Sequence, residues 1–197
     1  TSEDRAAYNG GQFWHTGHYT DAGTSKHRTY PRNAGLHGGG GDLLPPLWHG
    51  ASRVDGYELN STFIELLEHD FRDLNAIATR PEVSLIHSEA RVGIARSGRR
   101  YDVIQASLID TWAATASGGF VLSENGLYTR EGWATFLSHL TDTGILTMTR
   151  WHLDDAPAET HRLVSLASAS LTDARIDDPR SCIVLLRSTR YATILRC

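Results

Sequence analysis

The sequence predicts an α/β fold built on a doubly wound, mostly parallel sheet that ends in a C-terminal antiparallel hairpin. From residue 32 onward, short apolar runs alternate with amphipathic stretches of helical period, which is typical of repeated βα units. Near the C-terminus, two apolar runs are separated only by a turn at residues 187–190, and this spacing predicts the hairpin. In a sheet of this kind, ligands bind at the carboxyl ends of the strands.

The strands are predicted at short apolar runs, which cover residues 32–36, 52–57, 83–87, 101–109, 145–149, 181–186 and 191–195. The run at 101–109 contains Val103, Ile104 and Leu108 and is the most strand-like, so we expect it at the centre of the sheet. The first strand is the weakest prediction, because residues 32–36 are poorly apolar.

The helices are predicted where apolar residues recur on one face, at residues 61–71, 89–96, 127–140 and 157–171. Asn60 or Ser61 is expected to cap the first of these helices. Pro45 and Pro46 fit only the first turn of a further helix that follows a glycine-rich loop. The stretch from Thr141 to Gly144 reads as the turn that ends the helix at 127–140.

Composition and charge exclude several classes of protein. The 197 residues are 40% hydrophobic, which is enough for one full-sized core. A formal charge of −4 argues against a dedicated nucleic-acid binder. No apolar run reaches the roughly 18 to 20 residues of a membrane span. We expect a soluble, cytoplasmic protein with an irregular segment at residues 1–34 and one domain at residues 35–197.

Neither the cysteines nor the histidines indicate a metal site or a disulfide framework. Cys182 and Cys197 lack the spacing of a zinc ribbon or a disulfide scaffold, which favours a reducing compartment. Four histidines lie near the N-terminus without acidic partners or tight spacing, namely His15, His18, His27 and His37. We interpret them as solvated loop residues and expect no metal.

A run of four glycines, Gly38, Gly39, Gly40 and Gly41, is followed by Asp42 at a predicted strand-to-helix turn. Glycines allow backbone N–H groups to approach a ligand closely at a helix N-terminus. The run is neither a P-loop nor a clean G-x-G-x-x-G, and a flexible loop is the alternative interpretation.

Polar residues also follow the next three predicted strands. Glu58 ends the second strand, where a carboxylate can accept both hydroxyls of a ribose, although a surface residue beside the next helix is the alternative. Glu89 follows the third strand, and Asp110 lies at the end of the central strand. Because parallel strands end at a common edge, these residues predict one binding site.

The segment from about Gly35 to Trp151 resembles the spermidine synthase-like (polyamine aminopropyltransferase) proteins, a branch of the S-adenosylmethionine-dependent methyltransferase fold. The stretches that carry the resemblance are GGGGD, HGASRVDGYELN, PEVSLIHSEAR, RRYDVIQASLIDTWAATASGGFVLSENGLYT and LTDTGILTMTRWH. The long fourth stretch is the most specific. It is most similar to a subgroup in which this domain is attached to a membrane-spanning part that this chain does not include.

The resemblance implies a Rossmann-like methyltransferase fold, a transferase activity and a nucleoside cofactor, either S-adenosylmethionine or its decarboxylated form. By this resemblance, the glycines and Asp42 line the methionine and ribose portion, Glu58 holds the ribose hydroxyls and Glu89 faces the adenine. Asp110, Thr111 and Trp112 lie beside a small-molecule amine acceptor, and Asp110 attracts this amine and removes its proton. Glu124 and Tyr128 overhang the pocket, and Tyr128 or Trp112 packs on the sulfonium or the acceptor. The resemblance does not decide whether the protein forms a homodimer.

The chain departs from the family at one position that bears on the chemistry. Spermidine synthases carry two aspartates in a D-x-x-D arrangement after the central strand, and here Ser107 takes the first place. A serine hydroxyl does not accept a proton from an ammonium group at neutral pH. Two alternatives stay open. One is a catalytically decayed nucleoside-binding or regulatory module. The other is an esterase-type hydrolase that uses the loop from His37 to Gly40 as an oxyanion hole, although no G-x-S-x-G follows.

Overall fold

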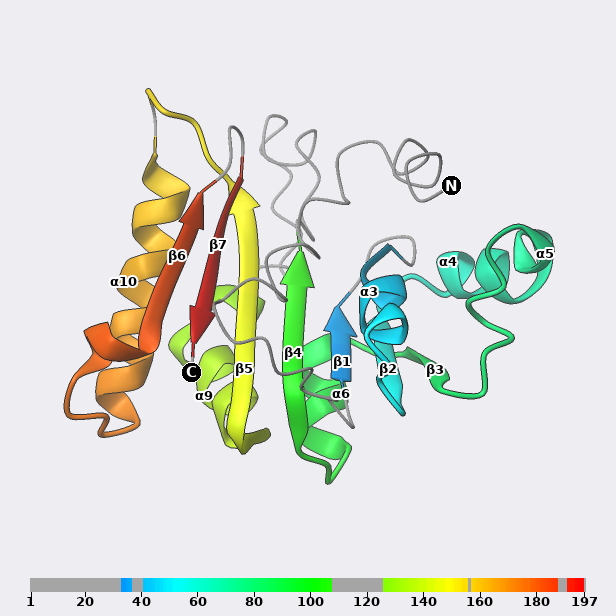
Figure 1. Cartoon of the computed structure of the whole chain (residues 1–197), viewed down its shortest axis with the longest axis horizontal. Coiled ribbons are helices and arrows are strands. Elements are labelled where there is room, and N and C mark those ends of the chain that lie inside the picture. Colours follow the sequence, from blue (N-terminus) through cyan, green and yellow to red (C-terminus); the bar gives the residue numbers. More distant parts are fainter. Residues whose placement is uncertain (1–32, 37–40, 108–125, 156, 188–190, 197) are drawn as a thin grey trace.

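A seven-stranded sheet forms the centre of the protein in the computed structural model, which describes residues 33–36, 41–107, 126–155, 157–187 and 191–196 (Figure 1). The strand order is β3-β2-β1-β4-β5-β7-β6, so β4 is the central strand, as the sequence predicts. The bounds of the strands are Asn33–Leu36 (β1), Val54–Glu58 (β2), Val83–His87 (β3), Tyr101–Ser107 (β4), Leu140–Trp151 (β5), Ile183–Arg187 (β6) and Tyr191–Arg196 (β7).

The pairing separates a parallel part of the sheet from an antiparallel part. Strands β1 to β5 pair in parallel, and β1 lies between β2 and β4. β7 runs antiparallel to both of its neighbours, β5 and β6. The alternation of apolar runs and amphipathic stretches therefore gives a parallel sheet with crossover helices, as the sequence predicts.

Helices cover both faces of this sheet. Their bounds are Leu44–Trp48 (α3), Ser61–Glu65 (α4), Arg72–Asn75 (α5), Ala90–Arg96 (α6), Arg130–Ser138 (α9) and Ala158–Asp173 (α10). Short 3₁₀ turns cover Gly41–Leu43 (η2), Gly126–Tyr128 (η4) and Pro179–Cys182 (η5), and Leu66–Asp70 (η3) forms a π-helical turn. One core lies under α3, and a larger core lies under α6, α9 and α10 on the other face.

Side-chain caps fix the starts of several helices. Asn60 accepts a hydrogen bond from the Thr62 N–H at 3.0 Å and caps α4, which confirms the expectation from the sequence. Thr129 accepts a hydrogen bond from the Gly132 N–H and caps α9. Within α6, Gly93 allows close packing on β2, because a Cβ at this position would lie 2.4 Å from the Tyr57 ring.

Two local expectations were wrong. Thr141 to Gly144 form no turn after the helix but belong to β5, which begins at Leu140. The Thr141 hydroxyl donates to the Asp102 carboxylate at 2.9 Å, which ties this polar stretch to the edge of β4. Ser181 and Cys182 belong to η5, so β6 begins only at Ile183. In both cases the residues flanking a strand are polar or small, and contacts with other segments decide their conformation: the bond from Thr141 to Asp102 in the first case, and the 3₁₀ turn capped by Asp178 in the second.

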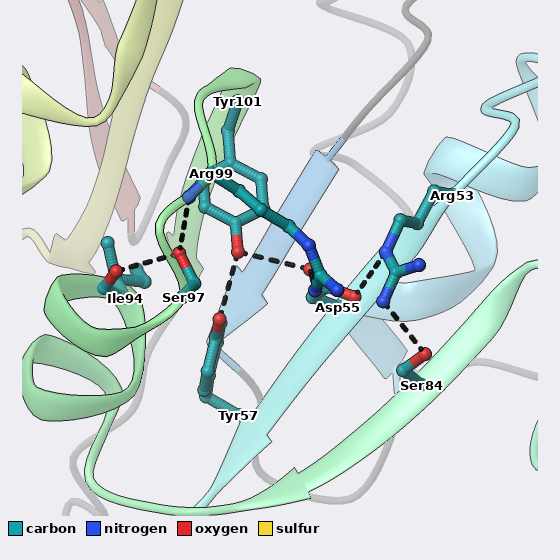
Figure 2. A network of polar contacts seen from close by, with 8 residues as sticks. All are labelled: Arg53, Asp55, Tyr57, Ser84, Ile94, Ser97, Arg99 and Tyr101. Carbon is teal, nitrogen blue, oxygen red and sulfur yellow. Dashed lines mark hydrogen bonds and ion pairs between the residues drawn. The ribbon is translucent and has the colours of Figure 1, made fainter.

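A buried polar network joins β2 to β4 toward the amino-terminal ends of these strands (Figure 2). The Asp55 carboxylate is fully buried and forms ion pairs with Arg53 and Arg99, both at 2.9 Å. The Tyr101 hydroxyl donates to Asp55 at 3.0 Å and lies 2.9 Å from the Tyr57 hydroxyl. Since Tyr101 gives its only hydroxyl proton to Asp55, Tyr57 is the donor to Tyr101.

In the described parts of the chain, no helix combines the length and the apolar character that crossing a membrane requires.

Candidate functional site

The end of β1 lies between two of the predicted site residues. Leu36, the last residue of β1, pairs with Tyr57 on one side and with Ala106 on the other. The residues that follow on the neighbouring strands, Glu58 and Ser107, therefore flank the end of β1. Two strand spacings separate them, which is about 10 Å between Cα atoms.

Glu58 and Ser107 also lie on the same face of the sheet. Tyr57 and Ala106 belong to the core under α6 and α9. Because side chains alternate along a strand, Glu58 and Ser107 point to the other face, which α3 covers. The ends of β2 and β4 thus place two of the predicted side chains on one face of the sheet, and their role in binding stays a prediction.

Asp42 extends this site from the chain that follows β1. It lies in η2 directly before α3, and its carboxyl contacts the side chains of Ser107 and Gln105. Burial raises the pKa of Asp42 to about 7, and hydrogen bonds from Ser107 and Gln105 counteract only part of this rise. Its Oδ2 atom is enclosed and has no hydrogen-bond partner among the described residues.

A row of polar side chains continues from Ser107 across the sheet. Gln105 Nε2 donates to the Ser107 hydroxyl at 3.3 Å, and Ser107 pairs with Thr149 of β5. Thr149 in turn pairs with Thr193 of β7, and their hydroxyl oxygens lie 2.8 Å apart. Gln105 and Thr149 are buried, which is unusual for polar residues in the interior of a sheet. Sequence reasoning missed this row, although Gln105 and Ser107 alternate with the apolar residues of β4.

The Glu58 carboxylate is buried at the end of β2 and is held by the chain beside it. Its Oε1 accepts the Asn60 N–H at 2.8 Å. Burial raises the pKa of Glu58, while the N–H groups of Asn60 and Leu59 and the nearby His87 lower it again. A carboxylate in this position can accept further hydrogen bonds from hydroxyl groups.

Glu89 has a structural role at the start of α6. Its two carboxylate oxygens accept the N–H groups of Arg91 and Val92, both at 3.0 Å. Arg91 also approaches the carboxylate at 3.8 Å. Glu89 thus caps the helix that follows β3, and its predicted contact with an adenine stays a prediction.

Tyr128 lies in η4, where its ring is covered by a cation that sequence reasoning did not anticipate. The Arg150 guanidinium lies 4.4 Å from the ring centroid, and it pairs with Glu159 of α10 at 2.6 Å. Arg150 follows Thr149 in β5, so this stack lies at the carboxyl edge of the sheet. One face of the Tyr128 ring is therefore used within the protein. In the sequence, the only signal of this arrangement was the position of Arg150 directly after the strand predicted at residues 145–149.

The other predicted site residues lie outside the described residues. They are Gly38, Gly39, Gly40, Asp110, Thr111, Trp112 and Glu124. The same holds for His37 of the alternative oxyanion loop and for the three histidines before it. The structure thus brings together Asp42, Glu58 and Ser107, and it places Tyr128 beside β5.

No protein-family profile and no curated protein matches the chain. Solved structures do match its fold. One is a spermidine synthase in complex with the transition-state analogue AdoDATO, with a TM-score of 0.61 and 17% sequence identity over 86% of this chain and 55% of that one. Another is the spermidine synthase from Thermotoga maritima, with a TM-score of 0.58 and 16% identity over 84% and 53% of the two chains.

Methyltransferases match at a similar level. An O-methyltransferase family protein from Burkholderia thailandensis gives a TM-score of 0.58 and 13% identity over 92% of this chain and 54% of that one. The chain spans about half the length of each of these three proteins. It therefore has the α/β fold that S-adenosylmethionine-dependent methyltransferases and spermidine synthases share. The similarity does not single out the spermidine synthases among them.

Proposed function

We propose that the chain binds S-adenosylmethionine or its decarboxylated form at the carboxyl edge of the sheet and transfers an alkyl group to a small-molecule amine. The observation that carries this proposal is the convergence of Glu58, Ser107 and Asp42 around the end of β1, on one face of the sheet. Parallel α/β sheets bind their ligands at this edge, and the solved structures that share the fold include a transferase with a transition-state analogue and a methyltransferase with bound SAH.

The residues at this edge of the sheet have the hydrogen-bonding groups that a nucleoside requires. Glu58 is a largely buried carboxylate at the end of β2, and it would accept the hydrogen bonds of two ribose hydroxyls. Gly41 begins η2 directly before α3, and with the preceding glycines it would let backbone N–H groups approach the ligand. Glu89 would select the base from the start of α6, although both of its oxygens already cap that helix.

The cofactor would supply an alkyl group on a sulfonium sulfur, which is already a good leaving group. The protein then has to hold the acceptor nitrogen in line with the carbon that is transferred. Alignment of two reactants contributes on the order of 7 to 11 kcal/mol when the geometry is ideal. Asp110 attracts the cationic acceptor, and Thr111, Trp112 and Glu124 line its site. Tyr128 would lie beside this site, with its ring held by the Arg150 guanidinium. No covalent enzyme intermediate is needed.

A nucleoside-binding module without turnover is the second candidate. It is favoured by the hydroxyl of Ser107 at the end of the central strand, a group that does not take up a proton from an ammonium. The amine acceptor, the homodimer and the cytoplasmic location stay predictions.

Calorimetric titration with S-adenosylmethionine, its decarboxylated form and methylthioadenosine tests the proposal. We expect micromolar or tighter binding of at least one of them. The preferred donor would distinguish methyl transfer from aminopropyl transfer. Binding without turnover of a panel of primary amines would favour the module, and absence of binding by all three nucleosides would overturn the proposal.

A further inference from the structure

Two arginines share one buried carboxylate at the amino-terminal edge of the sheet. Oδ1 of Asp55 accepts the Arg53 Nε–H and Oδ2 accepts the Arg99 Nη1–H, both at 2.9 Å. Arg53 lies directly before β2 and Arg99 shortly before β4, so the two guanidinium groups reach Asp55 from the strands that flank β1 (Figure 2). This edge is opposite to the carboxyl edge, where the proposed nucleoside site lies.

This cluster carries one positive charge in excess. The fully buried Asp55 carboxylate balances one guanidinium group. Among the described residues, no second carboxylate forms an ion pair with Arg53 or Arg99. The third donor to Asp55 is the neutral hydroxyl of Tyr101. A bound anion would balance the remaining charge.

Both arginines also retain N–H donors at the surface. Beyond Asp55, Arg53 donates to the Ser84 hydroxyl at 3.4 Å, and Arg99 contacts the Tyr101 hydroxyl. No other residue in the described part of the chain takes up their remaining N–H groups. The Arg53 side chain is 39% exposed and the Arg99 side chain 38%. An anion can therefore reach both guanidinium groups directly from solvent.

We propose that Arg53 and Arg99 bind a phosphate group on the side of the two guanidinium groups that faces away from Asp55. Because one carboxylate spans both groups, an oxyanion of similar size can span them from the outer side. The ion pairs with Asp55 hold both guanidinium groups in place, so little side-chain freedom is lost when the anion binds. The site is separate from the nucleoside site and does not depend on the proposed function.

The ligand that this cluster fits is a small phosphate, either inorganic phosphate or the phosphate group of a small ester. A phosphate has more acceptor oxygens and more charge than a carboxylate, so it gains more from two guanidinium groups. The formal charge of −4 on the whole chain disfavours a long polyanion such as a nucleic acid.

Titration of the wild-type protein with inorganic phosphate, at an ionic strength held constant with NaCl, tests this inference. NMR spectra of the arginine Nε–H groups follow the binding. We expect the signals of Arg53 and Arg99 to shift together and to saturate, with a dissociation constant on the order of 1 mM. The signal of Arg162, which is 73% exposed on α10, is the internal control and should not follow this curve.

Two conservative variants assign the binding to the arginine pair. Arg53→Lys and Arg99→Lys keep the positive charge and can still pair with Asp55, but they lack the planar fork of the guanidinium group. Each should weaken phosphate binding by about 10-fold or more, whereas the matched control Arg162→Lys should bind as the wild-type protein does. The wild-type spectra need no variant and are informative even if a variant does not fold.

A second titration with glycerol phosphate distinguishes the two sources of the phosphate group. Binding of glycerol phosphate as tight as that of inorganic phosphate would support a site for phosphate esters, and weaker binding would support a site for the free anion. The inference fails if neither compound gives saturating shifts, if Arg162 shifts in parallel with Arg53 and Arg99, or if both lysine variants bind phosphate as the wild-type protein does. None of these measurements uses a nucleoside, so their outcome is independent of the proposed function.

Discussion

The Tyr101 hydroxyl donates a hydrogen bond to the Asp55 carboxylate and thereby connects the two strands that flank β1. β1 has only four residues, so it offers β2 and β4 few backbone hydrogen bonds. The Asp55 network adds side-chain links between these neighbours (Figure 2). The positions of Glu58 and Ser107 at the far ends of β2 and β4 depend on this alignment.

Removal of the Tyr101 hydroxyl should destabilise the protein. Tyr101→Phe leaves Asp55 with one donor fewer and Tyr57 without its acceptor, at a cost of about 1 to 3 kcal/mol in the free energy of unfolding. Urea unfolding of Tyr57→Phe, Tyr101→Phe and the double variant measures the coupling between the hydroxyls. Ser138→Ala at the exposed end of α9 is the control, with a change within about 0.5 kcal/mol. Additive effects of the two tyrosine variants would show that the hydroxyls do not interact.

The raised pKa of Asp42 predicts a loss of stability as the pH rises. The protonated carboxyl is favoured in the folded state, so its contribution is fully present below pH 4 and is lost by about pH 7. Between pH 5 and pH 8, the wild-type protein should lose about 2 to 3 kcal/mol more than Asp42→Asn. Urea unfolding at both pH values measures the difference. The control is Asp142→Asn, because this side chain is fully exposed.

Glu58→Ala should weaken nucleoside binding. Loss of hydrogen bonds to a charged group costs about 1 to 3 kcal/mol, which calorimetry with methylthioadenosine resolves. Glu58→Gln keeps the size of the side chain and should give a smaller loss. Glu65→Ala on the exposed surface of α4 is the matched control and should bind as the wild-type protein does. Unchanged affinity in Glu58→Ala would remove this residue from the binding site.

The stack of Arg150 on Tyr128 predicts a different response to two substitutions of the ring. Tyr128→Phe keeps the aromatic face, and its free energy of unfolding should change little. Tyr128→Leu removes the cation–π contact and should cost about 0.5 to 2 kcal/mol. If Tyr128 also acts in transfer through its hydroxyl, Tyr128→Phe lowers kcat while stability is kept. Equal stability of both variants would argue that the stack contributes nothing.

Much of the fold follows from local sequence patterns. Apolar runs correctly predicted β3 and β4. The run that contains Val103 and Ile104 also identified the central strand, because buried parallel strands are apolar on both faces. The start of β5 was missed, since Thr141 and Asp142 are typical turn residues, and they lie where the register shifts between the pairs Tyr101–Leu140 and Val103–Ile145. The Thr141 hydroxyl connects this irregular stretch to Asp102 of β4. Strand propensity describes the isolated segment, whereas the conformation of these two residues depends on contacts with the rest of the sheet.

The position of the candidate site at the edge of the sheet could be predicted from the sequence, but the burial of its acidic group could not. Glu58 and Ser107 could be placed at one edge because parallel strands end together. The burial of Asp42 against Gln105 and Ser107 could not, because it depends on how η2 packs on β4. The stack of Arg150 on Tyr128 joins residues from β5 and η4, a contact between distant segments that one sequence does not reveal.

Gly93 allows α6 to pack closely on the sheet. Any other residue would drive a carbon atom into the Tyr57 ring, so the whole helix would have to lift. Glu89 caps that same helix and would move with it. A mutational scan for nucleoside binding should therefore find position 93 intolerant even of alanine.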